Sequence, residues 1–151
     1  MLTDLTRAGQ EKEQTKLAML DILTSNKLDK LKQIFHAFFA SIPHDWYRKN
    51  DMAGYEGYYC SIVYCYFNAL GLEVRVEDAT NHGKLDMAVL FNENIYIFEF
   101  KVNELTDSAK ALPQIKEKKY HEKYTGTEIY LIGIEFSKQD SNITRFEWAK
   151  V

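Results

Sequence analysis

The 151-residue sequence has few of the residues that build linkers and none of the long apolar runs that cross membranes. Two prolines and seven glycines are too few for a flexible linker or a low-complexity arm. No apolar run approaches the roughly 18 residues that a spanning helix needs, and the first residues lack a signal-peptide pattern. We therefore expect a cytoplasmic protein that has no membrane partner.

Cysteine is also scarce, since Cys60 and Cys65 are the only two. Their spacing is neither that of a CxxC redox pair nor that of half a zinc knuckle. We expect both to be reduced packing residues, as is usual for a cytoplasmic protein.

Neither sign of charge dominates, because 19 basic side chains face 22 acidic ones and the net charge is −3. This balance excludes a strongly cationic protein that coats DNA. It does not exclude a nucleic-acid enzyme that concentrates its positive charge locally. With 46% hydrophobic and 27% charged residues, the chain has the composition and length of one globular domain.

The hydrophobic pattern changes along the chain from a helical period to an alternating one. Helical spacing predicts helices over 4–23, from about 28 to Pro43, over 53–70 and up to 124. Alternating or continuous apolar runs predict strands over 72–77, 85–91, 95–102, 129–136 and 143–148. The order of elements predicts an α/β sandwich around a mixed sheet, in which the helix after the third strand is a crossover.

The strand over 95–102 is apolar on both faces except at Glu99 and Lys101. Such a strand is normally central and buried, so its two charges require partners or a function. The two residues share a face, because they are two positions apart. One interpretation is a structural salt bridge in which Lys101 neutralises an acid without any chemistry.

Asp86 on the preceding strand supplies a third charged group. If the hairpin loop has two or four residues, Asp86 lies directly opposite Glu99. Two facing carboxylates favour a cation between them, and hard oxygen ligands suit Mg²⁺ or Mn²⁺. A shift of one residue in the register would remove this pair and leave the structural interpretation.

Glu56 begins an apolar stripe on the third predicted helix, on the face that we expect to pack on the core. It is either a further polar group directed at the same site or a first-turn glutamate favoured by the helix dipole and open to water.

These segments, in this order, resemble the PD-(D/E)XK nuclease superfamily. The similarity extends over 77–86 with its Gly-Lys-Leu-Asp, over 96–101 with Phe-Glu-Phe-Lys, over 111–115 with Ala-Leu-Pro-Gln-Ile, and to Lys119 and Tyr120. The chain is similar to the nuclease-like domain that often follows an AAA-type ATPase-like domain in bacterial proteins. We take 1–25 as an N-terminal helical extension or linker remnant and 26–151 as the nuclease-like domain.

The resemblance implies a restriction-endonuclease-like three-layer sandwich with a central mixed sheet of about five strands. It also implies a divalent metal, Mg²⁺ or Mn²⁺, held by Asp86 and Glu99. We expect the carbonyl of Phe100 to be a third ligand of this ion. Lys101 would lie near the attacking water. Glu56 and Gln114 would be accessory site residues, although Pro113 directly before Gln114 departs from the usual helix pattern.

A lysine-rich segment over 110–123 could bind the phosphates of a nucleic acid. From it we take Lys118, Lys119 and Tyr120 as substrate-binding residues, and we add His82 from the turn before Asp86. The alternative is a solvated helix face with no ligand.

Three functions remain open on the sequence. The first is a metal-dependent nuclease domain that acts on nucleic acid, with DNA favoured. The second is a non-catalytic module that binds nucleic acid. The third is a partner-docking domain for an ATPase-like subunit, joined through the N-terminal helix.

Overall fold

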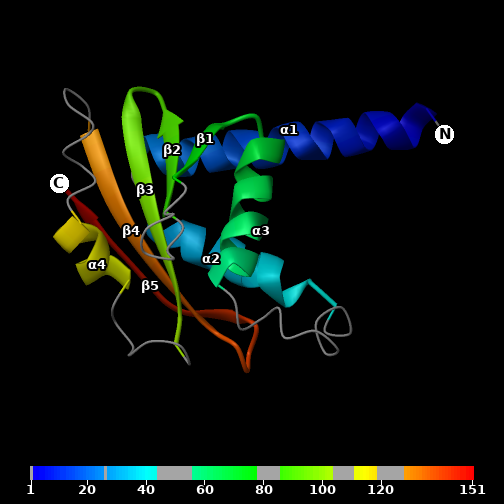
Figure 1. Ribbon diagram of the computed structural model, residues 1–151. Helices are drawn as coiled ribbons and strands as arrows, with labels where there is room; N and C mark the ends of the chain where they lie inside the picture. The colour runs from blue at the N-terminus through cyan, green and yellow to red at the C-terminus, as the bar shows by residue number, and fades with distance from the viewer. Residues whose placement is uncertain (1, 26, 44–55, 78–85, 104–110, 119–127) are drawn as a thin grey trace.

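The computed structural model describes residues 2–25, 27–43, 56–77, 86–103, 111–118 and 128–151 (Figure 1). The four helices among them are α1 (Leu2–Thr24), α2 (Asp29–Ala40), α3 (Glu56–Ala69) and α4 (Ala111–Lys118). Gly71 follows α3 with a φ of 84°, a left-handed conformation that ends helices and favours glycine. None of the described helices is long and apolar enough to cross a membrane.

One five-stranded sheet forms the centre of the molecule. Its strands are β1 (Glu73–Glu77), β2 (Asp86–Phe91), β3 (Asn94–Val102), β4 (Glu128–Ser137) and β5 (Asn142–Lys150), in that spatial order. Only β3 and β4 are parallel, and α4 lies between them in the sequence as the predicted crossover. Figure 1 shows α1, α2 and α3 on one side of the sheet and α4 on the other. The predicted three-layer α/β sandwich with a mixed sheet is confirmed.

The β2–β3 hairpin has the predicted register. Asn92 and Glu93 form the two-residue turn, with φ values of 52° and 63° that suit the tight turns of hairpins. Asp86 and Glu99 are therefore Cα partners in the antiparallel pair.

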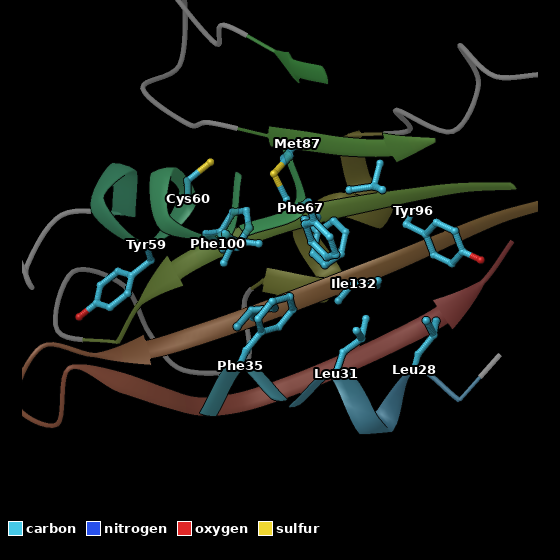
Figure 2. Packing of buried hydrophobic residues seen from close by; sticks show 14 of the residues in the cluster. Leu28, Leu31, Phe35, Tyr59, Cys60, Phe67, Met87, Tyr96, Phe100 and Ile132 are labelled. Atoms are coloured by element: carbon cyan, nitrogen blue, oxygen red, sulfur yellow. The ribbon is translucent and has the colours of Figure 1, made fainter. Parts of the chain in front are cut away.

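The larger core lies between the sheet and helices α1–α3 (Figure 2). Aromatic rings fill much of it: Phe67 of α3 lies 5.6 Å from Phe98 of β3, and Tyr59 stacks on Phe136 of β4 at 4.0 Å between ring centroids. Cys60 is buried in this core as expected, but Cys65 is exposed. The expectation that Cys65 packs inside is wrong, because it lies five residues further along α3, on a different side of the helix.

The last turn of α1 also belongs to this core. Met19, Ile22 and Leu23 are buried, and the buried Tyr96 hydroxyl of β3 donates a hydrogen bond to the carbonyl of Leu23 at 2.8 Å. This bond satisfies one of the carbonyls that a helix end leaves without a partner. The start of α1 projects beyond the sheet in Figure 1.

The opposite face of the sheet has a smaller apolar cluster under α4. Ile115 of α4 is buried against side chains from three strands, among them Ala88, Ile97 and Leu131. The helix reaches the sheet at Gly133 of β4. A Cβ there would lie 2.8 Å from the Cα of Leu112 and 2.9 Å from the carbonyl carbon of Ala111, so only glycine permits this approach.

Two expected helices extend into segments that the structure does not describe. The residues 53–55 before α3 and 119–124 after α4 lie outside the described ranges. Pro113 is the third residue of α4, in the first turn, where an amide hydrogen has no partner within the helix.

The contact at Gly133 makes Gly133→Ala a test of how α4 is held. We expect the substitution to lower the free energy of unfolding by about 1–3 kcal/mol, because backbone atoms rather than a flexible side chain must move. Urea unfolding measures this difference. Gly9→Ala is the matched control: no atom lies within 4 Å of a Cβ on Gly9 in α1. It should stabilise the protein or leave it unchanged, and equal effects of the two substitutions would contradict the argument.

The start of β4 offers a test by pH. Hydrogen bonds from Lys150 and Tyr130, followed by the charge of Lys150, hold the pKa of Glu128 below its usual value of 4.5. The ionised carboxylate therefore favours the folded state. Its contribution is complete above the unfolded pKa and is lost as the pH falls through the folded pKa.

Thermal unfolding of the wild type and of Glu128→Gln measures this effect. The substitution should lower the melting temperature slightly at about pH 7 and have no effect at about pH 2. A difference that persists unchanged at the lower pH would show that the charge of Glu128 is not responsible.

Candidate active site

Glu99 and Lys101 lie on β3, a strand that has neighbours on both sides. Their side chains are 0% and 1% exposed, and Lys101 Nζ lies 3.3 Å from Glu99 Oε1. Both positions belong to the face that α4 covers, since the alternate residues Phe98, Phe100 and Val102 are in the larger core. The predicted burial of these two charges and their shared face are confirmed.

Position 86 lies directly opposite position 99 in the β2–β3 pair. Directly opposed residues of an antiparallel pair belong to one face of the sheet, so the backbone brings Asp86 to the face of Glu99 and Lys101. The side chain of Asp86 lies outside the described part of the chain. The hairpin therefore has the register that pairs Asp86 with Glu99, and not the register shifted by one residue that would separate them.

Glu135 of β4 adds a buried charge that the sequence interpretation overlooked. It is 2% exposed, is the Cα partner of Lys101 in the parallel pair, and lies 3.6 Å from Nε of Arg145 on β5. The signal was present, because Glu135 interrupts an apolar strand just as Glu99 does. The nearly continuous apolar pattern of 129–136 predicts the strand but assigns no role to Glu135.

Arg145 of β5, at the edge of the sheet, contacts two carboxylates. Besides approaching Glu135, its Nη1 donates a hydrogen bond of 2.9 Å to Glu147. This hydrogen bond, together with the charges of Glu135 and Glu147, raises the pKa of the Arg145 guanidinium. We call Glu99, Lys101, Glu135, Arg145 and Glu147 the charged group of the α4 face.

Gln114 lies in the first turn of α4 and is half-buried. The contact of Ala111 and Leu112 with Gly133 fixes the start of this helix, and Gly133 is the strand partner of Glu99. Gln114 is thus on the helix that covers the face carrying Glu99 and Lys101. Its role at the site remains a prediction.

Glu56 is the first residue of α3. The stripe that it begins is buried as predicted, at Tyr59, Cys60, Val63, Phe67 and Leu70. The side chain of Glu56 itself is not described, so neither interpretation of it is tested.

The predicted substrate-binding residues lie almost wholly outside the described ranges. His82, Lys119 and Tyr120 are not described, and Lys118 ends α4 with a side chain that is not described. The Phe100 side chain is 2% exposed and packs in the larger core, which leaves only its backbone carbonyl as the predicted metal ligand.

The donor chemistry on this face suits a hard divalent cation. Two carboxylates at facing positions and a nearby backbone carbonyl are oxygen ligands of the kind that Mg²⁺ and Mn²⁺ prefer. Among the described side chains, to which that of Asp86 does not belong, no group of three or more His, Cys, Asp or Glu residues could hold a metal. The residues present therefore fit such an ion by their chemistry.

Comparisons with known proteins agree with this interpretation at the level of the family. An uncharacterized protein in the vnfD 5′ region of Azotobacter chroococcum mcd 1 is 54% identical over 130 residues, or 85% of this chain. The chain spans only 25% of the length of that relative. No solved structure matches the chain at a significant level. The family model of the PD-(D/E)XK nuclease superfamily matches residues 54–146, which include the hairpin, α4 and the β4 strand beside it. Since this match covers more than half of its length, the chain belongs to the PD-(D/E)XK nuclease superfamily.

Proposed function

We propose that this domain hydrolyses phosphodiester bonds in nucleic acid, with DNA as the favoured substrate and Mg²⁺ or Mn²⁺ as the cofactor. The observation that carries the proposal is the register of the hairpin. It pairs position 86 with position 99 and leaves the buried Lys101 on the same face, 3.3 Å from Glu99.

Nucleases of this superfamily generally use divalent metals. In this chain Asp86 and Glu99 would hold the ion, with the carbonyl of Phe100 as a further ligand. Such an ion lowers the pKa of its water and polarises the phosphate when it is bound. Two like charges at directly opposed strand positions repel each other, so the acidic pair itself favours a cation between its members.

Lys101 has the chemistry to orient the attacking water. Its ammonium group is held on β3, a strand fixed by hydrogen bonds to β2 and β4, and is 1% exposed. A donor held in this way loses little freedom when it binds a water or a phosphate oxygen, and it acts in surroundings where charge interactions are strong. We propose Glu56 and Gln114 as accessory residues that help to position the same water or phosphate.

Substrate binding requires positive charge outside the buried site. We propose that Lys118 at the end of α4, together with Lys119 and Tyr120 directly after it, contacts the backbone or a base of the nucleic acid. We propose that His82 contacts it from the segment before Asp86. Each lysine–phosphate contact releases counterions, so binding should weaken with added salt.

A longer relative suggests that other domains accompany this one. The similar protein of Azotobacter chroococcum is about four times as long as the matching region. We propose that the domain works beside an ATPase-like domain or subunit, with the projecting start of α1 as the joint (Figure 1). Cys60 and Cys65 are reduced thiols, as is usual in the reducing cytoplasm.

The test is cleavage of supercoiled plasmid by the purified protein with Mg²⁺ or Mn²⁺. We expect cleavage by the wild type and a loss of about a hundredfold or more in Glu99→Gln, because the metal ligand loses its charge. Glu128→Gln is the matched control, since it makes the same substitution at the exposed start of β4. Glu128→Gln should cleave like the wild type. Chelation of the metal should abolish cleavage by the wild type and by Glu128→Gln.

Equal traces of cleavage in the wild type and in Glu99→Gln would indicate a contaminating nuclease and contradict the proposal. If the wild type cleaves no plasmid, single-stranded DNA or RNA with either metal, a non-catalytic binding or docking module becomes the better interpretation.

A further inference from the structure

Lys101 has a buried glutamate at each of two neighbouring positions of the sheet. Glu99 precedes it by two residues on β3, and Glu135 is its direct partner on the parallel neighbour β4, where strands lie about 4.8 Å apart. Glu99 and Glu135 are 0% and 2% exposed, and both belong to the face that α4 covers. Lys101 thus has a second carboxylate available on the side away from β2.

Glu135 also has an ion-pair contact on its other side. Arg145 approaches it at 3.6 Å but makes its shorter contact, 2.9 Å, with Glu147, and the Arg145 side chain is 43% exposed. Solvent screens an exposed charge more than a buried one, so this contact offsets less of the Glu135 charge than a buried cation would.

The pair of Glu99 and Lys101 competes with a metal for the same carboxylate. The Lys101 ammonium group, 3.3 Å from Glu99 Oε1, either occupies the position that a metal ion would take or repels an ion bound beside it. Binding of a metal at Glu99 therefore requires Lys101 to weaken this contact. A buried ammonium group that loses its partner carries a high free-energy cost unless another carboxylate receives it.

We propose that Glu135 is a positioning residue that receives the Lys101 ammonium group when a divalent cation occupies Asp86 and Glu99. This inference rests on the metal site of the proposed function and adds a residue that acts through Lys101. Glu135 holds the Lys101 side chain on the active face, while Glu99 becomes available to bind the ion.

A double-mutant cycle on metal binding tests the inference without any activity measurement. Isothermal titration with Mn²⁺ compares Glu135→Gln with the wild type and makes the same comparison in a Lys101→Met background. We expect Glu135→Gln to weaken Mn²⁺ binding about tenfold in the wild type, as is common for residues that support a metal ligand. In the Lys101→Met background, Glu135→Gln should weaken Mn²⁺ binding by only about twofold or less. This remaining effect comes from the loss of one negative charge near the ion.

Glu147→Gln is the matched control, because it removes the same charge from the same face at the strand partner of Gly133. It should change Mn²⁺ affinity by no more than about twofold. Glu135→Asp should restore much of the affinity lost in Glu135→Gln. An equal weakening by Glu135→Gln in both Lys101 backgrounds would overturn the inference, while metal binding itself would still support the proposed function.

A crystal structure of the wild type with Mn²⁺ gives a second measurement that does not depend on any variant folding. We expect Lys101 Nζ within about 4 Å of a Glu135 carboxylate oxygen when the ion is bound. Lys101 still paired with Glu99 and remote from Glu135 would refute the role of Glu135. No Mn²⁺ bound at Asp86 and Glu99 would instead refute the proposed function, and the inference with it.

Discussion

The burial of a glutamate and a lysine within the central sheet is the constraint on which this structure depends. Each charge loses its water when β3 is enclosed by β2, β4 and α4, and the resulting desolvation cost is several kcal/mol per ion. An ion pair at 3.3 Å offsets part of this cost, but a hydrophobic pair of similar volume would often be as stable or more stable. Stability alone is therefore a weak explanation for Glu99 and Lys101.

The two faces of the sheet differ in the side chains that they carry. The face toward α1, α2 and α3 is apolar along the strands and holds the aromatic contacts of Figure 2. The face toward α4 has a small apolar cluster at one end and the charged group at the other. Because the larger core supplies most of the buried apolar area, the smaller face can tolerate charges that would destabilise a domain with a single small core.

The hairpin could be predicted from the sequence because its determinants are local. A two-residue turn at Asn92 and Glu93 fixes which residues are opposed, and alternation of apolar residues fixes which face each side chain takes. Asp86 and Glu99 followed from these two rules without knowledge of the rest of the fold. The buried stripe of α3 followed from helical spacing in the same way.

The features that escaped prediction depend on contacts between segments distant in the sequence. Glu135 was overlooked because its significance lies in its parallel pairing with Lys101, which only the crossover through α4 establishes. The β4–β5 pair has a register shift between Glu135 and Phe136, so spacing along β5 did not indicate that Arg145 meets Glu135. Gly133 likewise has no local explanation in the sequence of its strand. A glycine is required there because the α4 backbone approaches β4 at this position, which no local pattern encodes.

The charges on the α4 face would favour a cation beside the acidic pair. Between β2 and β5 the described strands place the acidic positions 86, 99, 135 and 147 on this face, against Lys101 and Arg145. Glu147 is 38% exposed and pairs with Arg145, whereas Glu99 and Glu135 are buried beside the buried ammonium group of Lys101. Like charges repel each other most strongly where water is excluded, and a divalent cation at the acidic pair would offset that repulsion. The two buried glutamates would then give Lys101 a second carboxylate to contact when Glu99 binds the ion, which is what the proposed role of Glu135 requires.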